Sequence, residues 1–282
     1  MEVVRHAHRY GCQHKFTEMF RRVAHDRPGF VILGDDNDYH TRYSPYILIQ
    51  SDVNSLRRGK PDPNERAMVE NAAGMVVTSP AHLDYLAKHY TLPPTEIVRL
   101  RPLACDLNIN PLQKRPKTVV YAGGLGGGYR DLRTPFAKIM RSGYELHIYA
   151  PYTASQRVRR AYERLGCVWH RPVPEGEPLY TELSQYTIGF HGYPIEASQR
   201  YVSTVLPNKC WEYLAAGIPT LGINAHLGGH VYNGRWGLTS DRYEDIPDLL
   251  ADLARMQVSE SDRQREVIDH DLPAFERLAQ CV

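Results

Sequence analysis

Residues 206–220, with the sequence LPNKCWEYLAAGIPT, decide how this chain is interpreted. The stretch has the pattern of a short helix, with polar residues at its start, Gly217 at its end and Pro219 just beyond. Lys209 and Glu212 are three residues apart, so a helix puts them on one face near its first turn. Free N–H groups at a helix start, with an ammonium and a carboxylate beside them, can hold a phosphate and a sugar hydroxyl together.

Short apolar runs alternate with helical segments along the chain, which is typical of an α/β protein with parallel sheets. The polar stretch 111–117 contains two prolines and predicts a domain boundary, which gives domains 1–113 and 114–282. The terminal helix, expected at 274–282, could pack back on the first domain. Strands are expected at 30–34, 46–50, 74–78, 96–100, 118–122, 145–149, 167–169, 187–190 and 220–223, and helices at 65–73 and 79–90.

Residues 209–219 resemble the donor-binding helix of GT-B glycosyltransferases, in the retaining group 1 or family 4 branch with the pattern Lys-x-x-Glu-Tyr-Leu-Ala-x-Gly-x-Pro. Residues 70–79, 121–125 and 184–190 are similar to three further segments of that family, in the same order along the chain. The resemblance implies a GT-B fold, in which two Rossmann-like domains face a cleft. The first 45 residues match poorly, so we expect a reduced N-terminal domain.

A glycine-rich loop, residues 123–133, stands between a predicted strand and a predicted helix. Glycines such as Gly123 and Gly124 let backbone N–H groups approach a phosphate closely. Arg130 and Arg133 are candidates for the cationic clamp that the resemblance implies after this strand. A flexible turn with solvated arginines is the structural alternative, and a dinucleotide site is a further one.

The resemblance also implies roles for single residues. Glu212 would accept the ribose hydroxyls of a nucleotide, Lys209 would face its diphosphate, and His191 would lie in a loop near the diphosphate or sugar. Asp52 follows a strand end where relatives often orient the acceptor, although it could equally cap the next segment. Lys209, Arg130 and Asp52 are therefore the candidate catalytic residues. The structural alternative for Lys209 and Glu212 is a surface pair worth about 0.2–0.5 kcal/mol.

Composition restricts the class of protein. No apolar run approaches the roughly 20 residues that a membrane span needs, and the N-terminus lacks the apolar core of a signal peptide, so we expect a cytoplasmic protein. The five cysteines are scattered, which suits reduced thiols. The resemblance implies catalysis without a metal, so we expect no metal ligand set. The nearest sequence to an Asp-x-Asp pair is the acidic stretch 35–38 after a predicted strand, for which a solvated loop is the alternative to a divalent-ion site. The resemblance implies a UDP- or GDP-sugar as co-substrate, and no further cofactor.

The leading hypothesis is a nucleotide-sugar-dependent glycosyltransferase that acts with retention and without a metal. The acceptor is open: a glycan, a small molecule, or a modified base of phage DNA. The formal charge of +2 argues against DNA, because DNA-binding proteins usually have a clearer basic surface. Two other classes stay open, namely a non-catalytic nucleotide-sugar-binding protein and a nucleotide-sugar epimerase.

Overall fold

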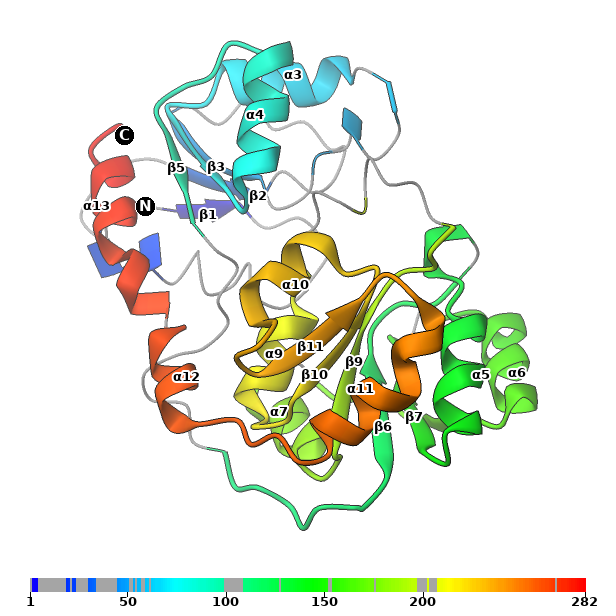
Figure 1. The fold of residues 1–282 in the computed structure, drawn as a ribbon. Helices are drawn as coiled ribbons and strands as arrows, with labels where there is room; N and C mark the ends of the chain where they lie inside the picture. The colour runs from blue at the N-terminus through cyan, green and yellow to red at the C-terminus, as the bar shows by residue number, and fades with distance from the viewer. Residues whose placement is uncertain are drawn as a thin grey trace. The chain divides into compact units, whose positions relative to one another are not determined.

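The chain divides into two compact units (Figure 1). The first comprises Met1–Cys105, Thr204–Leu206 and Glu266–Val282, and the second comprises Asp106–Ser203 and Pro207–Arg265. This division lies N-terminal to the boundary expected between residues 113 and 114. The computed structural model describes residues 2–4, 19–20, 22–23, 30–33, 45–50, 53, 55–56, 59–60, 62–98, 109–126, 128–151, 154–174, 176–196, 202, 207–266 and 268–282.

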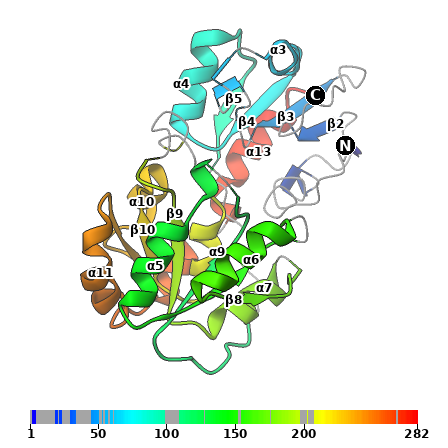
Figure 2. The ribbon, with the colours of Figure 1, turned by 90° about the vertical axis from the view of Figure 1, so that its right-hand side faces the viewer.

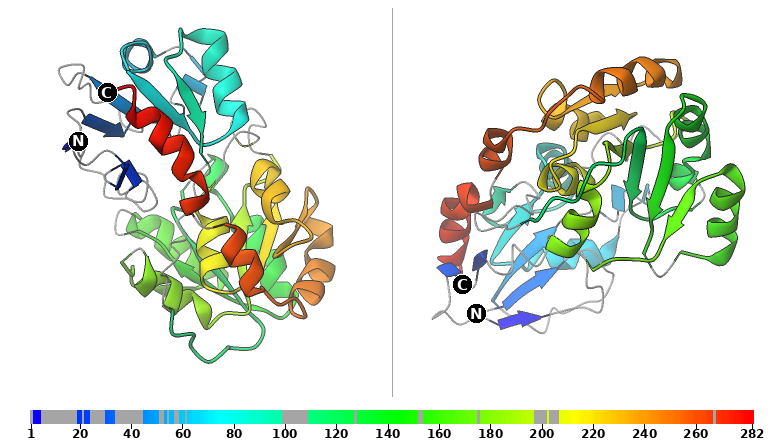
Figure 3. Two further views of the ribbon diagram at one scale, coloured as in Figure 1. Left: turned by 90° about the vertical axis from the view of Figure 1, so that its left-hand side faces the viewer. Right: turned by 90° about the horizontal axis from the view of Figure 1, so that it is seen from below.

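The first unit contains a parallel sheet whose five described strands follow one another in chain order. Helix α13 lies along this sheet (Figure 3) and contacts its last strand. The strands are β1 (Glu2–Val4), β2 (Phe30–Leu33), β3 (Tyr46–Gln50), β4 (Gly74–Val77) and β5 (Thr95–Ile97), and the helices are α3 (Pro63–Glu70), α4 (Pro80–His89), η3 (Ile268–Asp271) and α13 (Leu272–Ala279).

The second unit contains a parallel sheet of six described strands in the order β11-β10-β9-β6-β7-β8. The strands are β6 (Thr118–Ala122), β7 (Glu145–Tyr149), β8 (Val168–His170), β9 (Ile188–Gly192), β10 (Thr220–Ile223) and β11 (Gly237–Ser240). The helices are η1 (Gly128–Arg130), α5 (Arg133–Arg141), α6 (Gln156–Leu165), α7 (Glu177–Ser184), α9 (Lys209–Ala215), α10 (His226–Tyr232), η2 (Tyr243–Asp245), α11 (Ile246–Leu253) and α12 (Glu260–Arg265).

Local sequence explains where several helices begin and end. The Ser79 hydroxyl accepts the backbone N–H of His82 at 3.1 Å, and Pro80 occupies the first position of α4. Helix α6 begins after the cap Ser155 and ends at Gly166, whose φ of 102° favours glycine. Helix α9 ends before Gly217, which has a φ of 67°. The predicted helix start and glycine stop in residues 206–220 are therefore confirmed.

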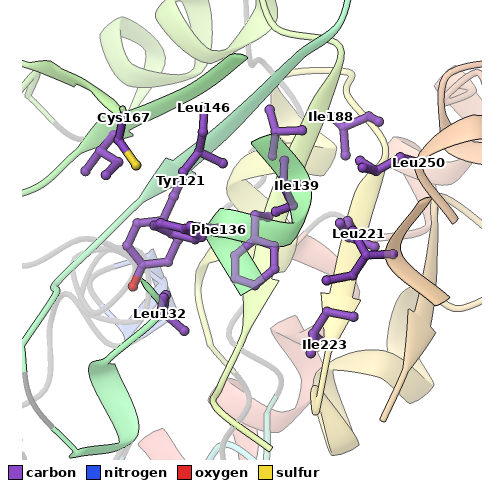
Figure 4. Close-up of a cluster of buried hydrophobic side chains, with 14 of the residues drawn as sticks. Tyr121, Leu132, Phe136, Ile139, Leu146, Cys167, Ile188, Leu221, Ile223 and Leu250 are labelled. Atoms are coloured by element: carbon purple, nitrogen blue, oxygen red, sulfur yellow. The ribbon is translucent and has the colours of Figure 1, made fainter. Parts of the chain in front are cut away.

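The core of the second unit lies between the sheet and helices α5, α6 and α11, and Figure 4 shows part of it. Leu146 and Ile148 of β7 contribute alternate residues to it, as expected for a strand covered on this face. Phe136 of α5 packs edge-on against Tyr121 and Phe190, with ring centroids 5.5 and 5.3 Å away. Helices α7, α9 and α10 cover the opposite face.

The predicted α/β fold with parallel sheets is confirmed, and the predicted strands are present with small shifts in their bounds. Two strands were not predicted, β1 and β11. The sequence of β11, GLTS, contains a single apolar residue, so it lacks the run that identifies a buried strand. One expectation is corrected: His191 does not follow a strand but lies inside β9.

Candidate functional site

The sheet of the second unit has a topological switch point between β6 and β9. Strands β7 and β8 extend the sheet on one side of this pair, and β10 and β11 extend it on the other. The ladder between β6 and β9 pairs Val119 with Ile188 and Val120 with Gly189. Both strands continue beyond this ladder, to Ala122 and Gly192. Ligands of open parallel sheets bind at such points, beyond the carboxyl ends of the strands.

The Tyr213 hydroxyl bridges β6 and β9 beyond the last pair of their ladder. It accepts the backbone N–H of Ala122 at 3.1 Å and donates to the carbonyl of Phe190 at 2.8 Å. The ring packs directly on the backbone of Gly189, where a Cβ atom would lie 2.3 Å from the ring. Tyr213 therefore satisfies two buried backbone groups and anchors helix α9 under the switch point.

Lys209 is the first residue of α9, and its side chain crosses the carboxyl edge of the sheet. A Cβ atom on Gly123 would lie 2.5 Å from Cε and 2.6 Å from Nζ of Lys209, so the lysine chain runs against the bare Cα of that glycine. Its Nζ lies 5.1 Å from the ring centroid of Tyr121, which belongs to the core on the other face. The structure thus brings Lys209 and Gly123 together.

Tyr121 and Arg130 both contact Gly124, the next residue of the loop. The Tyr121 hydroxyl donates to the carbonyl of Gly124 at 2.8 Å. A Cβ atom on Gly124 would lie 3.4 Å from a guanidinium nitrogen of Arg130, so this side chain lies on the glycine. Two cations, Arg130 and Lys209, therefore contact adjacent glycines at the end of β6. Fixed positive groups beside open backbone suit an anionic ligand.

Arg133 and Glu212 occupy different surroundings. The exposed Arg133 guanidinium donates to the Asp131 carboxylate at 2.8 Å, and this bond holds the pKa of Asp131 below its ordinary value. The structure thus engages Arg133 with its own neighbour rather than with the glycines. Glu212 is half-buried, one turn along α9 from Lys209, as the sequence pattern requires.

His191 is buried beneath the site, on the face of the sheet that α9 covers. Its Nδ1 atom lies 3.0 Å from the Tyr232 hydroxyl and 3.6 Å from the Cys210 sulfur. Burial, with a smaller contribution from the Lys209 charge, lowers the pKa of His191 to about 3. His191 is therefore neutral near pH 7. Its Nε2 atom has no hydrogen-bond partner among the described residues.

A pair of histidines, His147 and His170, lies on the same face, on β7 and β8. The Nδ1 atom of His147 is 2.8 Å from Nε2 of His170, whose ring stacks on Tyr149 with centroids 4.5 Å apart. The His147 side chain is fully buried, and burial lowers its pKa to about 4 although the Glu145 carboxylate lies 3.2 Å from Nε2. This face therefore contains histidines that stay neutral at physiological pH.

The remaining candidate, Asp52, lies outside the described residues, so its predicted role stays a prediction. Sequence reasoning did not give a role to Tyr121 or to Tyr213. Tyr213 is part of the Lys-x-x-Glu-Tyr pattern, and its place in that pattern could have indicated a role for it. Nothing in the sequence indicates that Tyr121 faces Lys209, because that contact depends on how the lysine crosses the sheet edge.

The described part of the chain contains neither a metal-binding cluster nor a membrane-spanning helix. No group of three or more His, Cys, Asp or Glu side chains could hold a metal ion there. No described helix combines the length and the apolar character that a membrane crossing requires.

Comparisons with known proteins gave matches among solved structures. No family model matches the chain, and no curated protein matches it. The structures of a mutant of S. aureus TarM with UDP and of Anabaena HepE with UDP-glucose match with TM-scores of 0.63 and 0.62, at 9% and 10% identity. The match to TarM covers 95% of this chain and 58% of TarM, and the match to HepE covers 84% of this chain and 72% of HepE.

The pneumococcal O-GlcNAc transferase GtfA, in complex with UDP and GlcNAc, matches with a TM-score of 0.54 at 10% identity, over 84% of this chain and 52% of GtfA. The chain thus spans about half the length of that protein. Identities this low show the fold alone. With its two parallel-sheet units, the chain has the fold of the GT-B glycosyltransferases.

Proposed function

We propose that this protein is a glycosyltransferase that takes a sugar from a nucleotide-sugar, and that the second unit binds this donor. The observation that carries the proposal is the passage of Lys209 over Gly123 at the switch point, with Arg130 on the neighbouring glycine. The three matched structures named above hold UDP or UDP-glucose, which supports a UDP-linked donor.

The arrangement suits the departure of a diphosphate. In the proposed reaction the bond between the anomeric carbon and the diphosphate oxygen breaks, and the electron pair leaves with the nucleoside diphosphate. Lys209 and Arg130 would stabilise the growing negative charge, and Glu212 would accept the ribose hydroxyls. The neutral His191 beneath them adds no competing cation.

The second half of the reaction forms a bond from an acceptor hydroxyl oxygen to the anomeric carbon. The hydroxyl proton passes to an oxygen of the leaving diphosphate, so that protons and charge balance without an enzyme nucleophile. We propose that the sugar keeps its anomeric configuration, that no metal takes part, and that Asp52 orients the acceptor. These points rest on the resemblance of residues 209–219 to the retaining branch.

The test is a thermal-shift panel of nucleoside diphosphates and nucleotide-sugars, with Glu212→Ala and, as a matched control, Glu244→Ala. Glu244 is an exposed carboxylate outside the site. A ligand at about 100 times its Kd stabilises the fold by about 2.7 kcal/mol, which is a readable rise in Tm. We expect a shift with uridine compounds that disappears in Glu212→Ala and persists in Glu244→Ala. No shift with any nucleotide would refute the donor site.

Turnover separates an enzyme from a binding protein. We expect release of nucleoside diphosphate from the donor that binds, and a loss of about 100-fold or more in kcat for Lys209→Ala with the fold intact. Binding without any turnover, tested with glycan, small-molecule and DNA acceptors, would favour the non-catalytic class. Interconversion of the nucleotide-sugar without an acceptor would favour an epimerase.

A further inference from the structure

The chain is nearly neutral overall, but two of its segments carry large net charges of opposite sign. Residues 128–171 contain nine Lys and Arg against three Asp and Glu, a net of +6. Residues 241–282 contain five Lys and Arg against eleven Asp and Glu, a net of −6. The formal charge of +2 therefore says little about any one surface, and the basic segment, which includes α5 and α6, is a candidate for an anionic partner.

Helix α6 presents a row of three arginines to solvent. Arg157, Arg160 and Arg164 are spaced i, i+3 and i+7, so they lie on one face of the helix, and all three are exposed. With a rise of about 1.5 Å per residue, the row is about 10.5 Å long. Glu163, the one acidic residue of α6, pairs with Arg159 at 2.7 Å. Among the described residues, the three arginines of the row form no ion pair.

The stability of α6 does not account for this row. Arg157 lies in the first turn, where the helix dipole disfavours a cation. The helix is already held by its Ser155 cap, by the αL residue Gly166 and by its buried face. These arginines are therefore available to an anion outside the protein.

The helix that carries the row packs beside the start of α5. Tyr162, on the buried side of α6, accepts the backbone N–H of Leu132 through its hydroxyl at 2.8 Å. Leu132 directly precedes α5, and Figure 2 shows α5 and α6 side by side. Arg130 and Arg133 flank this point. Helix α6 is therefore fixed beside the start of α5 by its buried side, and the row of arginines lies on its exposed face.

The shape of this surface favours a linear polyanion over a membrane. Val158, Tyr162 and Leu165, the larger apolar residues of α6, pack on the core, so the helix has no apolar face to insert between lipids. The arginines of the row are about 4.5 and 6 Å apart along the helix axis. Their long, flexible side chains can therefore each reach a different phosphate of an extended strand.

We propose that Arg157, Arg160 and Arg164 bind the phosphate backbone of a nucleic-acid strand. The inference rests on charge and spacing, and it is independent of the proposed donor chemistry. It gives the second unit a partner of stated chemistry, a phosphate backbone, in addition to the proposed donor. The contact is with phosphates and carries no sequence preference.

The experiment measures binding of a fluorescein-labelled 20-nucleotide single strand by anisotropy, at 50 and 200 mM NaCl. The triple variant R157Q/R160Q/R164Q is compared with R242Q/R255Q/R265Q, which removes the same charge from exposed arginines of the acidic segment. Each phosphate contact contributes about −0.7 to the slope of log K against log salt. We expect the first variant to lose about 2 from that slope and at least tenfold in affinity at 50 mM, and the control to keep both within about twofold.

Three outcomes would overturn the proposal: no binding by the unmodified chain, an equal loss in both variants, or binding only to vesicles of 3:1 phosphatidylcholine and phosphatidylserine run in parallel. Circular dichroism melting shows whether each variant is folded. The uridine-nucleotide thermal shift, measured on the same samples, separates the two proposals. A strand-binding failure with that shift intact leaves the donor site standing.

Discussion

Gly123→Ala tests the central feature of the site, the passage of Lys209 over the sheet edge. The new Cβ atom would lie 2.5 Å from Cε and 2.6 Å from Nζ of Lys209, closer than real Cβ contacts. The obstructing atoms are the far end of a flexible side chain, so the lysine moves while the sheet persists. The ammonium then leaves its position 5.1 Å from the Tyr121 ring centroid.

The magnitude follows from what the lysine would contribute. A hydrogen bond from an ammonium to a phosphate is worth about 1.5 to 3 kcal/mol. Its loss weakens nucleoside diphosphate binding about 10- to 150-fold. The φ of 150° at Gly123 adds backbone strain of about 1 to 3 kcal/mol, which lowers stability rather than affinity.

Isothermal titration with UDP measures the effect, and Gly143→Ala is the matched control. Gly143 has a φ of 82° with open space around its Cα, so alanine there adds strain without touching Lys209. In a double-mutant cycle, Gly123→Ala should add almost nothing to Lys209→Ala, because both remove one contact. Equal UDP affinity in the two glycine variants, or additive losses in the cycle, would refute the reasoning.

Three further predictions concern the second unit. Tyr213→Phe leaves two buried backbone groups unpaired and should lower the free energy of unfolding in urea by about 2 kcal/mol or more, about twice the effect of Tyr162→Phe, which frees one group. Burial lowers the pKa of His147 from 6.5 to about 4, so between these pH values the unfolded chain binds a proton at this histidine and the folded chain does not. The free energy of unfolding should therefore fall as the pH drops from 6.5 to 4, by up to about 3 kcal/mol. Arg130→Gln should weaken UDP binding about tenfold, whereas Arg133→Gln, whose arginine already pairs with a neighbouring carboxylate, should change it less than threefold.

Each of these has a control and a contrary result. An equal unfolding midpoint for the two tyrosine variants contradicts the bridging role. His147→Gln should reduce the fall in stability between pH 6.5 and 4, of which His191 leaves a remainder, and the exposed His89→Gln should not reduce it. Identical pH profiles for the two variants would contradict the assignment. A larger effect at Arg133 than at Arg130 would mean that the ligand displaces Asp131 from its partner.

Sequence patterns predicted the elements that have a strong local signal. Buried apolar runs such as 118–122 became strands, and the Ser79–Pro80 and Gly217 signals marked helix ends. His191 was wrongly expected in a loop, because histidine and glycine interrupt the apolar run. In the structure Gly192 approaches the backbone of Ile223 so closely that a Cβ atom would lie 2.2 Å from its carbonyl oxygen, and the strand therefore continues.

Contacts between distant segments were the part that sequence could not predict. The positions of Lys209 and Gly123 in their patterns favoured a shared ligand, but the crossing to Tyr121 depends on the packing of α9 against β9. The formal charge of +2 carries no information about where charges lie, since a sum over the whole chain does not show the row of arginines on α6.

The crossing of Lys209 also has a consequence for the order in which the protein assembles. The lysine comes from a helix that follows β9, and the glycine that it crosses follows β6, so neither half of the sheet holds the site alone. The proposed ligand site therefore forms only after the two halves have joined. A bound nucleotide would raise the free energy needed to separate the two halves of the sheet. Hydrogen exchange at the amide of Ala122, which is bonded to the Tyr213 hydroxyl, would therefore slow as ligand is added.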